Sequence, residues 1–158
     1  MGFFGPKRER WEVWVKETVA SELRPGESVE VVSVAAINPP TAKAQTATLA
    51  ASAAVSVALG GGMIMMQSIA KSFVVLTNQR LLVLRANQRT GKPVPGIAWA
   101  AERSSITATD ARQRNLWRSF EVIRSDGPVL GRFDFPRPNR ADCDAIASLL
   151  QTSIRMPG

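Results

Sequence analysis

The chain contains no histidine and a single cysteine, Cys143, among its 158 residues. The lack of histidine removes the most common general base and the most common metal ligand together. A single cysteine excludes an intramolecular disulfide and any metal site built from several cysteines. We therefore expect a protein that is not an enzyme and that uses neither a metal nor a cofactor.

Motifs that carry chemistry are missing as well. The glycines Gly60–Gly62 are not followed by the Lys-Ser/Thr pair that completes a phosphate-binding loop. Asp142 and Asp144 stand two residues apart in an expected helix, so their side chains diverge. No catalytic pair is predicted, and no small-molecule substrate is expected.

Positive charge is concentrated in the second half of the chain. Residues 80–140 contain twelve Lys/Arg and five Asp/Glu, and the whole chain has a formal net charge of +7. Such an excess favours anionic partners, namely nucleic acid, anionic lipid headgroups or acidic protein surfaces. A solvated basic face without a partner is the alternative. The residues expected to form a basic surface are Arg80, Arg89, Lys92, Arg112, Arg114 and Arg118.

The N-terminal region predicts an amphipathic helix. The first ten residues do not resemble a secretory signal, because no long apolar run follows the positive charges, and a cytoplasmic location is therefore expected. Over Pro6–Leu23 an apolar residue recurs every fourth position, beginning with Trp11. We expect this stripe to pack the helix against a sheet.

Two apolar runs at the centre of the chain predict an antiparallel hairpin. Phe73–Leu76 and Leu81–Leu84 flank the polar segment Thr77–Arg80. Five further segments have the composition of strands: Ser28–Ile37, Ile97–Ala101, Ile106–Arg112, Trp117–Arg124 and Val129–Phe135. With the two runs of the hairpin, seven strands are expected. In the last of them, alternation places Val129, Gly131, Phe133 and Phe135 on one face.

The end of the chain predicts a second amphipathic helix. Asn139 is a suitable N-cap, and Cys143, Ile146, Leu150 and Ile154 follow a helical stripe. Cys143 is therefore expected to be a buried apolar residue and not a nucleophile.

A long uncharged segment precedes the hairpin. Ala44–Ala70 holds 27 residues without a charge between Lys43 and Lys71. Its length would allow a membrane span, but glycines interrupt it, and the strands on either side must lie on one side of a bilayer to share a sheet. We expect two helices, Thr41–Leu59 and Met63–Ala70, that cover the sheet, self-associate or touch lipid. The candidate contact residues are Lys43, Leu59, Met63, Ile64, Met65, Met66 and Lys71.

The order of these segments resembles the bacterial pleckstrin-homology-like (PH-like) domains. The resemblance rests on the hairpin Phe73–Leu84 with its Leu-Thr-Asn-Gln-Arg-Leu sequence, on the later strands and on the helix Asn139–Ile154. The Ala/Gly-rich insertion also resembles small actinobacterial proteins of this kind.

The resemblance implies an α+β, mainly β fold: a seven-stranded antiparallel barrel or sandwich capped by a C-terminal helix. The implied organisation is an N-terminal amphipathic helix (1–25), a PH-like domain (26–154) with a helical insertion between its first two strands (41–71), and a tail (155–158).

The resemblance also implies a binding or scaffold module. We expect it to act at a membrane surface or in a homo-oligomeric or protein assembly, in the cytoplasm and in peripheral contact with the inner face of the cell membrane. Relatives that bind phosphoinositides carry clustered Lys and Arg between the first two strands, where this chain has little besides Lys43. The alternative is a nucleic-acid-binding β domain that stacks bases on Trp99, Trp117 or Phe120.

Overall fold

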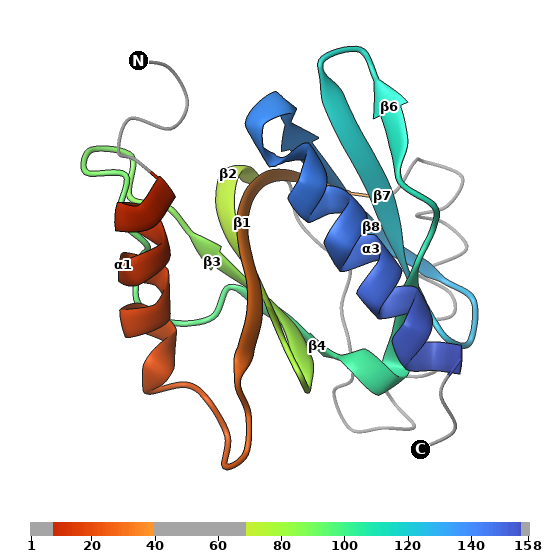
Figure 1. Cartoon of the computed structure of the whole chain (residues 1–158), viewed down its shortest axis with the longest axis horizontal. Coiled ribbons are helices and arrows are strands. Elements are labelled where there is room, and N and C mark those ends of the chain that lie inside the picture. Colours follow the sequence, from red (N-terminus) through yellow and green to blue (C-terminus); the bar gives the residue numbers. More distant parts are fainter. Residues whose placement is uncertain (1–7, 40–68, 156–158) are drawn as a thin grey trace.

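The computed structural model describes residues 8–39 and 69–155; of residues 153–155 and of Ala70 only the backbone is described. These residues form one curled antiparallel sheet with helix α1 (Arg8–Ala20) on one side and helix α3 (Arg140–Arg155) on the other (Figure 1). The strands are β1 (Val29–Asn38), β2 (Ile69–Thr77), β3 (Arg80–Arg85), β4 (Trp99–Glu102), β5 (Ile106–Ala108), β6 (Arg112–Arg114), β7 (Trp117–Arg124) and β8 (Val129–Pro136).

The sheet has the strand order β4-β3-β2-β1-β8-β7-β5, and β6 pairs separately with β7. Most of β1 pairs with β2, and its last three residues pair with β8. β1 therefore joins the first half of the sheet, β1–β4, to the second half, β5–β8. Short 3-10 turns, η1 (Arg103–Ser105) and η2 (Arg137–Asn139), connect β4 to β5 and β8 to α3. A mainly β fold with a C-terminal helix was expected, and the structure confirms it in this form. The hairpin is confirmed too, since Phe73 pairs with Leu84 and Leu76 with Leu81.

The predicted strand Ile106–Arg112 is two strands, so the described residues form eight strands and not seven. β5 pairs with the end of β7, whereas β6 pairs with its beginning. Between them, the backbone N–H of Thr109 donates to Glu121, and the Thr109 hydroxyl accepts from the backbone N–H of Glu121. This side-chain contact replaces regular pairing, and the expected single strand ends there.

The prediction of a helix ending at Ala70 was wrong at its last two residues. β2 already begins at Ile69, because β1 is ten residues long and Ile37 pairs with Ile69. Lys71 is accordingly a strand residue and does not mark the end of the insertion. The remainder of the predicted helices lies outside the described residues.

The predicted face of the last strand was also wrong in part. Between β7 and β8 the register shifts. Val122 pairs with Gly131, but the next residue, Ile123, pairs with Val129, so Leu130 is an extra residue between these two pairs. A bulge of this kind changes which side of the sheet the following residues face. Leu130 therefore enters the core beside Phe133 and Phe135, and Val129 does not.

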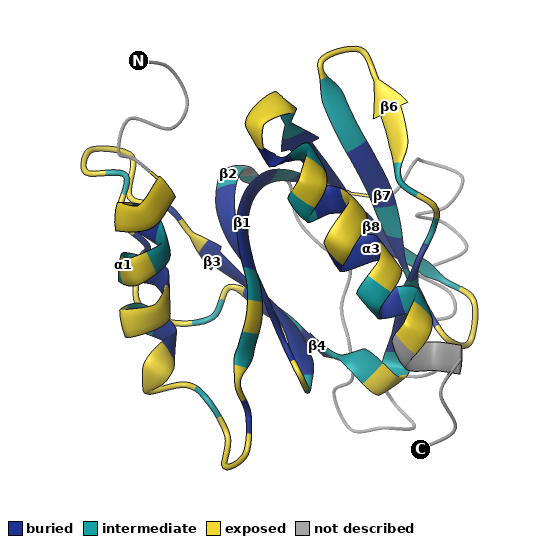
Figure 2. Cartoon of the chain, viewed as in Figure 1, coloured by how far each residue is buried: buried dark blue, intermediate teal, exposed yellow. Residues whose placement is uncertain are grey.

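The main core fills the concave side of the sheet, and α3 closes it. Cys143, Ile146 and Leu150 have no exposed surface and pack with the inner faces of both halves of the sheet. The rings of Phe120, Phe133 and Phe135 lie 5.4–6.3 Å apart at its centre. α3 also contacts η1, the turn that connects β4 and β5, which are the two end strands of the sheet. Figure 2 shows the buried residues of α3 turned toward the sheet.

A second core lies on the outer face of the first half of the sheet. α1 covers this face with Trp11, Val15 and Val19, which are 0–3% exposed. The ring of Trp11 lies 6.0 Å from that of Phe73. The helix ends at Ala20 and not at the predicted Leu23, which packs at the margin of this core, and the predicted start at Pro6 lies outside the described residues. None of the helices in the described ranges is long and apolar enough to cross a membrane.

Candidate functional site

Arg80, which was predicted to lie on a basic surface, is buried. Its guanidinium donates to both carboxylate oxygens of Glu27, at 3.0 and 2.7 Å, and to the backbone carbonyl of Glu22. The Glu27 side chain has no exposed surface, and the Arg80 side chain is 10% exposed. The prediction failed because an arginine can enter the protein interior when a carboxylate and a backbone carbonyl accept hydrogen bonds from its guanidinium.

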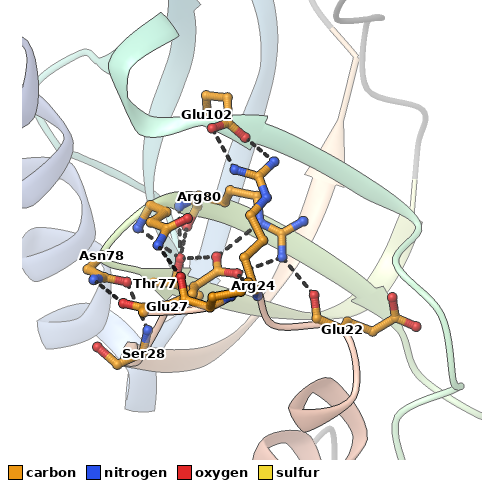
Figure 3. A network of polar contacts seen from close by, with 11 residues as sticks. Glu22, Arg24, Glu27, Ser28, Thr77, Asn78, Arg80 and Glu102 are labelled. Carbon is orange, nitrogen blue, oxygen red and sulfur yellow. Dashed lines mark hydrogen bonds and ion pairs between the residues drawn. The ribbon is translucent and has the colours of Figure 1, made fainter.

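The other polar residues of the hairpin turn serve the same contact. The Thr77 hydroxyl donates to Glu27, and Asn78 bonds to the backbone of Gly26 and Ser28 (Figure 3). The bonds from Arg80 and Thr77 lower the pKa of Glu27 to about 2, although burial opposes this. The Thr77–Arg80 segment therefore holds the linker between α1 and β1 against the sheet. Its polar side chains are used in these contacts and are not available to bind a partner.

The remaining predicted basic residues do not form one surface. Lys92 lies 5.1 Å over the ring of Trp14, beside α1, and Arg89 is exposed in the same loop. Arg118 forms an ion pair with Asp144 of α3 at 2.6 Å. Only Arg112 and Arg114 lie together, on the fully exposed strand β6. The expectation of a single basic face was therefore wrong, because the fold distributes these residues over different sides of the sheet.

The predicted insertion residues Lys43, Leu59, Met63, Ile64, Met65 and Met66 lie outside the described residues, so their role stays a prediction. Lys71 is half-buried on β2, and burial lowers the pKa of its ammonium group.

Two open depressions lie side by side on the outer face of the second half of the sheet. One holds about 380 Å³ and the other about 580 Å³, and Arg114, Ser119 and Arg132 line both. Cross-strand pairing explains this grouping: Arg112 lies opposite Ser119, and Ser119 lies opposite Asp134. Nothing in the sequence pointed to Arg132 or to a binding role for Asp134, because the face exists only when four strands are side by side.

The charges inside the depressions are balanced. Asp134 accepts bonds from Asn38, Ser119 and Arg132, so the charge of Arg132 is offset by its own neighbour. Asp110 and Glu121 also line the wall. The two depressions together are lined by three guanidiniums and three carboxylates, so as a whole they carry no excess positive charge that would concentrate an anion. Among the side chains that line the depressions, Arg112 and Arg114 form no ion pair within the described residues.

Both arginines belong to the hairpin β6–β7, whose tip stands apart from the body of the molecule (Figure 1). The tip is a two-residue connection, Asn115-Leu116, in which Asn115 has a φ of 53° and Gln113 donates to its carbonyl at 2.9 Å. Leu116 is 72% exposed, more than any other large apolar residue in the described part of the chain. Figure 2 shows β6 and the tip as exposed throughout. We call Arg112–Arg118 the basic hairpin.

The aromatic residues considered for nucleic-acid stacking are mostly in the core. Trp99 is 8% and Phe120 is 2% exposed, so neither ring can receive a base. Trp117 is half-buried and lies next to the Asn115-Leu116 tip, opposite Arg114. The alternative function therefore loses two of its three proposed platforms.

The geometry offers no catalytic chemistry in the described residues. No group of three or more His, Cys, Asp or Glu lies close enough there to hold a metal ion. Burial raises the pKa of the Cys143 thiol to about 12, which leaves it protonated and inert at neutral pH.

Comparisons with known proteins found matches among solved structures alone. No family model matches the chain, and no curated protein matches it. Among solved structures, one similar chain is a crystal structure titled as a pleckstrin homology domain from Shewanella amazonensis SB2B. It has 12% sequence identity and a TM-score of 0.38 over 85% of this chain and 96% of that chain. Because this TM-score is low, the fold described above rests on strand order and helix position. The bacterial and actinobacterial resemblance stays a prediction.

Proposed function

We propose that this protein is a non-enzymatic, PH-like binding module that attaches to an anionic surface through its basic hairpin. The observation that carries the proposal is the pair Arg112 and Arg114, which are exposed and not ion-paired within the described residues, on a hairpin that projects from the sheet. The surface is that of a membrane or of an acidic partner in an assembly.

Several features support this function over catalysis. The whole chain lacks histidine, and its single thiol is buried in the main core. The outer depressions are charge-balanced, whereas the basic hairpin carries three arginines and no carboxylate in seven residues. A cytoplasmic location is part of the proposal, since the cytoplasmic leaflet carries the anionic lipids to which basic segments bind.

Vesicle flotation tests the proposal directly. Wild-type protein is expected to float with vesicles that contain anionic lipid and to dissociate as salt is raised. The double variant Arg112→Gln/Arg114→Gln should bind about 30-fold more weakly, since each arginine near an anionic surface contributes about 1 kcal/mol. A matched control is Arg10→Gln/Arg89→Gln, which removes the same charge from exposed positions in α1 and the β3–β4 loop.

Different outcomes separate the alternatives. Equal loss in both double variants would show that only net charge matters and would contradict a role for the basic hairpin. Salt-sensitive binding to single-stranded nucleic acid without vesicle binding would instead favour the nucleic-acid function. Retention of a homogeneous oligomer without vesicle binding would favour assembly.

A further inference from the structure

The tip of the basic hairpin combines an exposed apolar side chain with positive charge. Leu116 is 72% exposed, and Arg112, Arg114 and Arg118 stand within four residues of it in the chain. A single exposed leucine needs no explanation on a protein surface. Its position between arginines, at the end of a projecting hairpin, does need one.

The turn itself does not require a leucine. Tight connections favour Gly, Asn, Asp or Ser, and Asn115 already supplies the left-handed conformation at φ 53°. The bond from Gln113 to the Asn115 carbonyl holds this conformation. Leu116 therefore contributes nothing to the turn that a polar residue would not, and the structure leaves its side chain in water at a free energy cost.

The charges around the tip specify the kind of surface that Leu116 meets. Arg112 and Arg114 face the same side of β6, where Arg114 pairs with Trp117 in the backbone ladder. Trp117 follows the leucine directly, at the tip end of the hairpin, and is half-buried. An apolar tip, a neighbouring tryptophan and flanking arginines are the combination that peripheral proteins present to the headgroup and acyl boundary of an anionic bilayer.

We propose that the Asn115-Leu116 tip inserts into an anionic lipid bilayer, with Leu116 entering the apolar boundary and Arg112 and Arg114 binding lipid phosphates. This inference rests on the proposed function and narrows it from an anionic surface to lipid. A nucleic acid backbone would use the arginines alone, and binding to an acidic protein instead of lipid is an outcome of the tests below.

The first test removes the apolar contact and keeps the charge. Leu116→Ser is expected to bind anionic vesicles about tenfold more weakly than wild type. Val13→Ser is the matched control, because Val13 is 53% exposed on α1, away from the hairpin, and its substitution should leave binding unchanged. Both variants change exposed side chains, so thermal unfolding should match that of wild type and exclude misfolding.

The second test reports insertion itself. In Leu116→Cys, an environment-sensitive fluorophore can be attached at position 116 alone, because the native Cys143 is buried. On addition of anionic vesicles its emission should shift to the blue, and lipid-phase quenchers should quench it. The same label in Val13→Cys should not respond.

The outcomes distinguish failure of this inference from failure of the proposed function. If wild type binds anionic vesicles and loses binding in Arg112→Gln/Arg114→Gln, but Leu116→Ser binds equally well and the label stays in water, insertion is wrong and charge-dependent attachment stands. If wild type binds no anionic vesicle, or binds only an acidic protein or nucleic acid, the lipid inference is wrong whatever the label shows.

Discussion

The ion pair between Glu27 and Arg80 is the clearest case of a single residue whose role depends on its surroundings. Both side chains are buried, and the two are joined by two hydrogen bonds, with further bonds from Thr77 to Glu27 and from Arg80 to the backbone. Removal of one member of such a pair leaves an uncompensated charge in the interior. A nearby pair, Arg24 with Glu102, has similar geometry but is about half exposed, and screening by water reduces its contribution.

Glu27→Gln should destabilise the fold by roughly 3–5 kcal/mol, because Arg80 would keep its charge without a carboxylate. Urea unfolding at neutral pH measures this loss. The matched control Glu102→Gln removes the exposed pair and should leave the unfolding midpoint nearly unchanged. Equal effects of the two substitutions would contradict the burial of the Glu27–Arg80 pair.

The same pair predicts a dependence of stability on pH. The pKa of Glu27 is lowered from 4.5 to about 2 in the folded protein, so the folded state holds fewer protons than the unfolded state between these values. Its stabilisation is present above pH 4.5 and is lost as pH falls through 4.5 toward 2, by roughly 3 kcal/mol at most. Comparison of urea midpoints at pH about 6 and about 3 should show a smaller acid loss in Glu27→Gln than in wild type.

At the scale of elements, the outer face of the sheet is covered by a helix over its first half and is open over its second half. α1 covers the first half, where Val32, Val34 and Phe73 face it and are almost fully buried. The second half presents polar residues that line open depressions beside the basic hairpin. Polar outward faces are compatible with water, whereas an apolar outward face requires a covering helix. α1 is therefore an integral part of the fold.

Trp11→Ala should cost roughly 3–5 kcal/mol in the free energy of unfolding, because it removes the largest side chain that α1 contributes to the second core. The neighbouring substitution Val13→Ala lies on the exposed side of the same helix and should change stability by no more than about 0.5 kcal/mol. A Trp11→Ala protein as stable as Val13→Ala would show that α1 does not pack on the sheet.

At the scale of the whole molecule, α3 links the two halves of the sheet through one core. Cys143 lies in that core with no exposed surface, next to residues from both halves. Its thiol can meet a reagent only when α3 separates from the sheet, so its reactivity reports opening of the molecule as a whole.

Cys143 should react with a thiol reagent orders of magnitude more slowly than a free cysteine, at a rate that rises steeply in urea near the unfolding midpoint. The time course of thiol labelling measures this. In Leu116→Cys a second, rapid phase should appear, since position 116 is exposed. A fast reaction of Cys143 in native wild type would contradict the closed core.

The candidate site could be predicted only in part. Arg112 and Arg114 were predicted from charge alone, but they were grouped with residues such as Arg80 that the fold places elsewhere. Leu116 was missed, although a leucine beside Asn in a short arginine-rich connection is an unusual turn residue and is a usable signal. Sequence spacing alone does not indicate which arginines remain without a carboxylate. Some partners are two residues away, such as Asp134 for Arg132, whereas others come from distant segments, such as Glu27 for Arg80.

The sequence by itself determined the elements whose identity depends on local periodicity: the stripes of Trp11, Val15 and Val19 and of Cys143, Ile146 and Leu150, and the hairpin around Thr77. Period and turn chemistry act over a few residues, so they can be read along the chain. Only the tertiary structure decided that Arg80 is buried, because its partner Glu27 stands 53 residues away. It also decided the bulge at Leu130 and the exposure of Leu116, since both follow from how separate strands pair and where the sheet ends.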